Sequence, residues 1–147
     1  MNYYWFLFYT FAAEIIQLAM KKLMMSMLLL TAFIQVYADD VMRKEKDGTY
    51  VVNTTTLAED VKGYIESTPV EIYIKKNKIV KVVPLKTMDG PKYVAKVKNG
   101  MLTKYEGMKI EKKAPLPKVD GVTGATFTSD AMREHINRAI AYYQKHK

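Results

Sequence analysis

The clearest alternation of apolar and polar positions in the chain runs from residue 70 to residue 75. Every second side chain in this stretch is aliphatic, which places the aliphatic set on one face of a β-strand. Lys76-Asn77 follows, and asparagine tolerates the positive φ of a tight turn. The mostly apolar residues 79–85 then predict the returning strand, with Pro84 at a strand end or a sheet edge. This part of the chain is therefore predicted to form an antiparallel hairpin.

The C-terminal residues show a helical period instead. Apolar side chains recur at positions i, i+4, i+7, i+8 and i+11, which are Met132, Ile136, Ala139, Ile140 and Tyr143. Such a stripe is typical of an amphipathic helix that packs its apolar side on the rest of a fold. We expect the helix to run from Asp130, with Thr128 or Ser129 as its cap. His135 is expected to lie partly buried at its surface.

Weaker patterns predict the remaining elements of the domain. Residues 49–55 and 101–108 are predicted as short strands, and residues 63–65 as the possible opening of another. Residues 93–98 predict a short helix, with Pro91 in its first turn and Gly100 as its cap, and residues 39–48 a frayed lead-in. Together these elements predict one α+β domain: a small, mostly antiparallel sheet with the C-terminal amphipathic helix packed on it.

The N-terminal region has the pattern of an export signal. Met20-Lys21-Lys22 supplies positive charge, residues 23–36 are mostly apolar, and small side chains precede a predicted cleavage after Ala38. Residues 1–38 are thus interpreted as a signal peptide region with its true start at Met20, and residues 39–147 as the exported domain. The alternative is a long signal or a membrane anchor that keeps the protein tethered.

Composition narrows the possible chemistry. The 147-residue chain has no cysteine, so disulfides and thiolate metal sites are impossible. Its two histidines are too few for an imidazole cluster, and we expect no metal site. The formal net charge is +8, but the basic residues are spread along the chain, which together with predicted export argues against nucleic-acid binding.

Residues 120–129, called the motif segment below, carry the most specialised chemistry. Gly121 and Gly124 allow close backbone approach and positive φ, and threonine and serine supply hydroxyls just before the predicted helix. The free N–H groups of a helix start favour a bound phosphate. The same residue types also serve as ordinary turns and helix caps.

The motif segment resembles the flavin-attachment motif of the FMN-binding domain family, Asp-x-x-Ser/Thr-Gly-Ala-Thr-x-Thr/Ser, and matches it without a break from Asp120 to Thr128. The family includes flavin subunits of the sodium-pumping NADH:quinone oxidoreductase and Rnf complexes. The resemblance implies that Thr126 carries FMN through a phosphoester, installed by a separate flavin transferase that uses FAD. The other cofactor-binding residues that it implies are Asp120, Gly121, Thr123, Gly124, Ala125, Phe127 and Thr128.

A weaker resemblance covers most of the domain. Gly63-Tyr64 and Thr68-Pro69-Val70 match a pattern familiar in small exported members of the family. Asp89-Gly90-Pro91 departs from the Glu-Thr-Pro that many flavin-bearing members have near the isoalloxazine ring. The acid and the proline are kept and the hydroxyl is lost.

The function expected from these features is that of an exported flavoprotein electron carrier. Redox partner proteins at a membrane surface would supply and accept the electrons, because the chain has no nucleotide-binding glycine loop and no second redox centre. We expect no catalytic residues in the chain itself. The candidates for stacking on the ring are Tyr64, Tyr73, Tyr93, Tyr105 and, as the best of them, Phe127. The alternatives are an exported cofactor-free binding module of the same fold and a small flavin-dependent reductase.

Overall fold

The computed structural model describes residues 15–22, 24 and 41–147. Residues 15–22 and 24 are helical and exposed, and they belong to a unit separate from the C-terminal domain. The predicted cleavage site after Ala38 lies outside the described residues, as does the apolar run before it except for Met24. Within the described residues, no helix combines the length and the apolar character needed to cross a bilayer.

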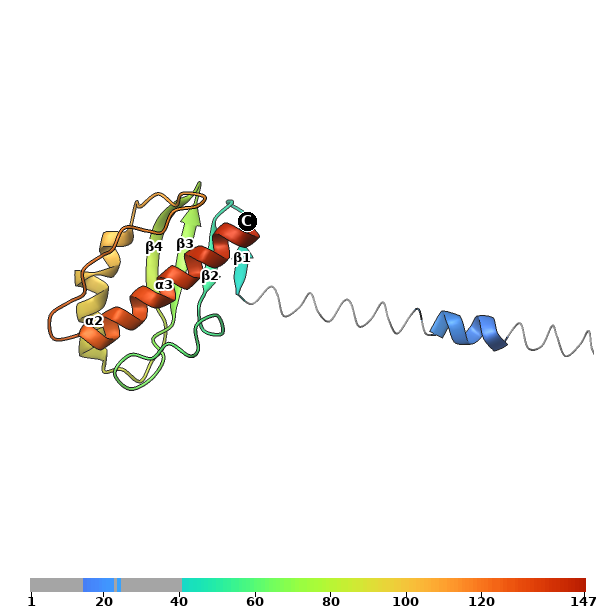
Figure 1. Cartoon of the computed structure of the whole chain (residues 1–147), viewed down its shortest axis with the longest axis horizontal. Helices are drawn as coiled ribbons and strands as arrows, with labels where there is room; N and C mark the ends of the chain where they lie inside the picture. Colours follow the sequence, from blue (N-terminus) through green and yellow to red (C-terminus); the bar gives the residue numbers. More distant parts are fainter. Residues whose placement is uncertain (1–14, 23, 25–40) are drawn as a thin grey trace, which may run out of the picture. The chain divides into compact units, whose positions relative to one another are not determined.

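The domain is built on one antiparallel sheet with the strand order β1-β2-β3-β4 (Figure 1). Its strands are β1 (Met42–Lys44), β2 (Tyr50–Asn53), β3 (Val70–Lys75) and β4 (Lys78–Pro84). The predicted α+β fold is confirmed. The expectation of a frayed lead-in at residues 39–48 is wrong, because β1 lies there and pairs with β2, with Met42 opposite Val52.

The predicted hairpin is confirmed as β3 and β4. Lys76 and Asn77 have φ values of 49° and 59°, the backbone that a two-residue hairpin turn needs. Burial alternates along β3, with every second side chain buried, and Pro84 ends β4 at the sheet edge. The aliphatic face of β3 therefore points into the core, as its sequence pattern indicates.

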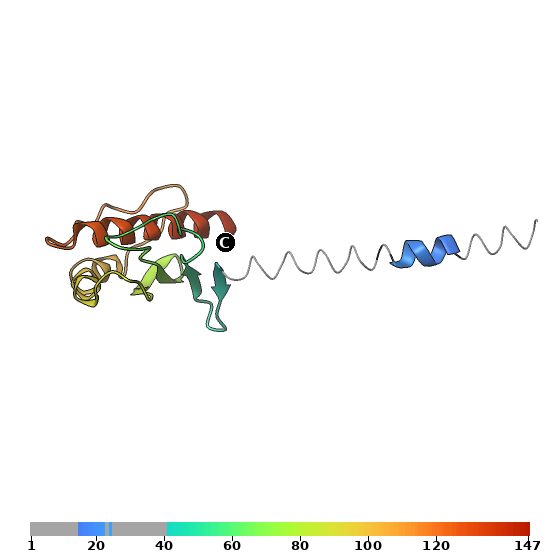
Figure 2. The same ribbon diagram turned by 90° about the horizontal axis from the view of Figure 1, so that it is seen from below.

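Helix α3 (Thr126–His146) crosses one face of the sheet (Figure 2). The whole predicted apolar stripe is buried: Met132, Ile136, Ala139, Ile140 and Tyr143 are at most 3% exposed. The helix begins four residues before the predicted Asp130, so the expected caps, Thr128 and Ser129, lie inside its first turn. His135 was expected to be only partly buried and is fully buried.

Two helices lie between β4 and α3. Helix α2 (Pro91–Gly100) contains the predicted residues 93–98 and has Pro91 at its start. The strand predicted at residues 101–108 is wrong, because the 3₁₀ helix η1 (Leu102–Tyr105) forms there and buries Leu102 and Tyr105 on its inner side. Residues 63–65 form no strand either, since only an isolated bridge joins Lys62 and Ser67.

Candidate functional site

The motif segment is a tight turn that leads directly into α3. The Ala125 N–H donates to the Val122 carbonyl at 3.0 Å, and Gly124 has a φ of +77°, which favours glycine at this position. Ser129 N–H makes the first intrahelical bond, to the Ala125 carbonyl. The N–H groups of residues 126–128 therefore have no partner within the helix and form its positive end.

The hydroxyls of the motif segment fall into two classes. Thr128 is buried and donates to Oδ2 of Asp89 at 2.7 Å. Ser129 is also buried, and its Oγ accepts the Val122 N–H at 3.0 Å. Thr123 and Thr126 are exposed. Two hydroxyls thus hold the segment in shape, whereas two are accessible to another molecule.

Asp89 is the buried carboxylate that holds the site together. Besides Thr128, it accepts the backbone N–H groups of residues 64–66 at 3.0, 2.7 and 3.3 Å. Burial acts to raise the pKa of Asp89, but these hydrogen bonds outweigh it and hold the pKa below its usual value. A Cβ on Gly63 would lie 2.3 Å from Oδ2, so the carboxylate fits only against glycine. Asp89 therefore connects the turn before α2 to residues 64–66 and to the first turn of α3.

A hollow of about 330 Å³ lies beside Thr126, and we call it the aromatic hollow. It is lined by Tyr64, Tyr93 and residues 124–128. Tyr64 and Phe127 lie with ring centroids 6.1 Å apart and are 69% and 66% exposed. Tyr93 is 44% exposed. Aromatic side chains gain free energy when they are covered, so this cluster is a ready surface for a planar apolar ligand.

The structure brings together only part of the predicted site. Tyr105 is buried in the core, and Tyr73 lies on the sheet with its hydroxyl on Glu71, so neither lines the aromatic hollow. A Cβ on Gly121 would approach Ser129 to 3.0 Å, which explains this glycine by packing. Asp120 is exposed and does not line the hollow.

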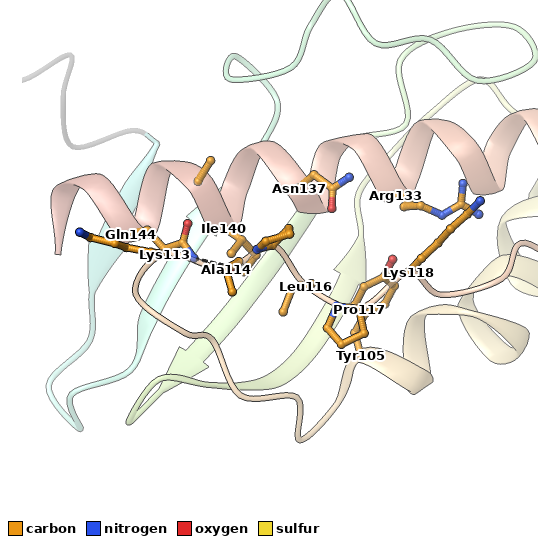
Figure 3. Close-up of a pocket in the computed structure, with 12 residues that line it drawn as sticks. Tyr105, Lys113, Ala114, Leu116, Pro117, Lys118, Arg133, Asn137, Ile140 and Gln144 are labelled. Carbon is orange, nitrogen blue, oxygen red and sulfur yellow. Dashed lines mark hydrogen bonds between the residues drawn. The ribbon is translucent and has the colours of Figure 1, made fainter.

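A second hollow, of about 520 Å³, lies between residues 113–118 and α3 (Figure 3). Gln144 holds one end of this loop by donating to the Glu111 and Ala114 carbonyls, and Arg133 holds the other by donating to the Val119 carbonyl. No residue of the motif segment lines it. The motif segment therefore lines the aromatic hollow and not the larger second hollow.

The buried hydrogen bonds of His135 were not predicted from the sequence. His135 lies 2.9 Å from Oγ1 of Thr54 and 3.2 Å from Oγ of Ser67, and burial holds its pKa below the usual value. Its position among the buried residues of the α3 stripe, one before Ile136, was the available signal. Among the described residues, no group of three His, Asp or Glu side chains is arranged to hold a metal ion.

The comparisons with known proteins point to one family. The family model described as FMN-binding domain matches residues 63–141, which is more than half of the chain. The matched part begins at the loop that contains Gly63 and ends within α3. No curated protein and no solved structure matches the chain.

Proposed function

The chain belongs to the FMN-binding domain family, and we propose that it is an exported electron carrier with FMN attached covalently to Thr126. The observation that carries the proposal is the exposure of Thr126 at the start of α3, on the rim of an aromatic hollow. Export rests on the positive, apolar and small-residue pattern that ends at Ala38. The domain supplies a site for the flavin, and partner proteins supply and remove the electrons.

Attachment requires a hydroxyl that another enzyme can reach. In the proposed transfer, Thr126 Oγ1 forms a bond to the phosphorus on the FMN side of FAD, the pyrophosphate bond of FAD breaks, and AMP leaves. The hydroxyl proton passes to a base of the flavin transferase, because threonine is a poor nucleophile without such help. Thr126 suits this role, whereas Thr128 and Ser129 are buried and already hydrogen-bonded.

The residues around Thr126 fit the two parts of the cofactor. The free N–H groups at the start of α3 favour the charge of the phosphodiester by about 0.3–1 kcal/mol at such an exposed site. Tyr64, Tyr93 and Phe127 offer faces and edges on which a planar ring can stack. The bound FMN would supply reversible one- and two-electron chemistry. The aromatics that line the hollow are exposed, so partner proteins could approach a ring bound there.

The test is co-expression with an active flavin transferase, followed by denaturing gel electrophoresis and mass spectrometry. The wild-type chain should give a flavin-fluorescent band and a mass gain of one FMN less one water. Thr126→Ala should lose both, whereas Thr123→Ala, which removes the other exposed hydroxyl of the motif segment, should keep both. A wild-type chain that stays unlabelled beside a labelled reference substrate, or a labelled Thr126→Ala chain, would contradict the proposal.

A further inference from the structure

One face of α2 runs along the motif segment. Tyr93 lines the aromatic hollow, and a Cβ on Gly124 would lie 3.5 Å from Nζ of Lys96. A Cβ on Gly100 would approach Val122 to 2.9 Å. These three α2 residues are spaced by three and four positions, so they share one helix face. Figure 1 shows α2 beside the start of α3.

Lys96 is the positively charged residue on the face of α2 that it shares with Tyr93 and Gly100. Its ammonium group lies over the turn at Gly124, two residues before Thr126. α2 contains no acidic residue, and in the part of the chain that the structure describes Lys96 forms no ion pair. Arg133 lies at the other side of the segment, and there it is already paired with Asp130. Lys96 and the start of α3 thus both place positive charge at the motif segment.

We infer that Lys96 binds the phosphodiester that links the flavin to Thr126, an inference that rests on the proposed function. The linkage carries one negative charge at a residue flanked by the free N–H groups of α3 and by the Lys96 ammonium. Lys96 therefore closes the phosphate site from the side of α2, while Tyr93 on the same helix face contacts the ring. Helix α2 positions both parts of the cofactor at once.

The inference is tested by comparing unloaded and flavin-loaded forms of each variant. Urea unfolding gives the unfolding equilibrium constant of both forms, and their ratio reports how much the attached flavin stabilises the fold. A lysine with a merely structural role changes both forms equally and leaves the ratio unchanged. A lysine that binds the phosphodiester changes the ratio. The chain offers a matched control in Lys98, which lies on the same helix, is exposed and is turned away from the shared face.

Lys96→Ala should reduce the ratio by about two- to fivefold, the size expected of one exposed ion pair. Lys96→Arg should restore it, Lys98→Ala should match the wild type, and the difference should shrink at 1 M salt. The ³¹P resonance of the loaded protein should shift in Lys96→Ala and not in Lys98→Ala. A labelled wild type whose ratio and ³¹P resonance are unaffected by Lys96→Ala overturns the inference and leaves the proposed function standing. An unlabelled wild type overturns both.

Discussion

Oγ1 of Thr128 donates a hydrogen bond to Oδ2 of Asp89 across a distance of 2.7 Å, and both side chains are buried. The bond joins the first turn of α3 to the turn before α2, two segments 39 residues apart. Asp89 also holds the backbone of residues 64–66, which carry Tyr64. The aromatic hollow is therefore assembled around one buried carboxylate.

Replacing Thr128 by valine, which has nearly the same shape, should destabilise the domain by about 1–3 kcal/mol. The variant leaves Asp89 with one donor fewer in a buried position, and an incompletely satisfied buried group carries a cost of that order. Urea unfolding measures the change. Because Thr128 is not the proposed acceptor, flavin attachment should persist in the folded variant. A Thr128→Val chain as stable as wild type would show that the bond contributes little.

Asp89 should also contribute to the loss of folding stability at acidic pH. Its folded-state pKa lies below the ordinary 3.8, so the charged carboxylate stabilises the fold above that pH, and the stabilisation is lost as pH falls through the folded-state pKa. We expect Asp89→Asn to lower stability at pH 7 by about 2–3 kcal/mol, because an amide cannot accept all four donors. Unfolding measured between pH 5 and pH 2.5 should show a shallower decline in Asp89→Asn than in wild type.

Gly63→Ala should be more disruptive than an ordinary glycine substitution. The added methyl would lie 2.3 Å from Oδ2 of Asp89 and 2.8 Å from Cγ2 of Thr68, and Asp89 is held by four hydrogen bonds. We expect a cost of about 1–3 kcal/mol, as for overpacked sites. Gly48→Ala is the control, because its methyl meets nothing within 4 Å and adds only the strain of a φ of +82°. Equal Tm losses in the two variants would contradict the packing argument.

The parts of the fold that could be predicted are those specified by neighbouring residues. The β3–β4 hairpin has its strand alternation and its turn within one continuous stretch, and the α3 stripe repeats over several turns. β1 could not be found in this way, since it is three residues long, two of the three are exposed, and it exists only through pairing with β2. Met101, Leu102 and Tyr105 are all buried, and their spacing is helical. The β-propensity of this stretch nevertheless favoured a strand in the prediction.

The candidate site likewise has a part that contiguous residues specify and a part that depends on contacts between distant segments. Thr126 could be singled out because the motif segment is contiguous, and the turn at Gly124 follows from local backbone preference. The aromatic hollow could not be derived, because Tyr64, Tyr93 and Phe127 come from three separate segments. The anchoring role of Asp89 depends on contacts with residues 64–66 and Thr128, and no local pattern encodes such contacts.

His135 should make stability depend on pH above the carboxylate range. Burial holds its folded-state pKa below 6.5, despite the opposing effects of the Val61 carbonyl, Asp60 and Glu134. The unfolded chain therefore takes up a proton first, and stability falls as pH drops through 6.5. We therefore expect a decline in the free energy of unfolding between pH 7.5 and pH 5.5, measured by urea unfolding. His135→Gln should be less stable overall but lack this decline; the same slope in both chains would exclude His135 as its source.

Phe127→Ala should alter the bound flavin while leaving the fold almost unchanged. The side chain is 66% exposed and contacts Tyr64 at the rim of the hollow, so its removal should change the free energy of unfolding by no more than about 0.5 kcal/mol. In the flavin-loaded protein, however, the loss of a stacking partner should raise the native flavin fluorescence and shift the reduction potential. Tyr142→Ala is the control, because Tyr142 stacks on His146 at the far end of α3. Identical fluorescence and potential in both loaded variants would mean that the ring lies outside the aromatic hollow, even if Thr126 is its point of attachment.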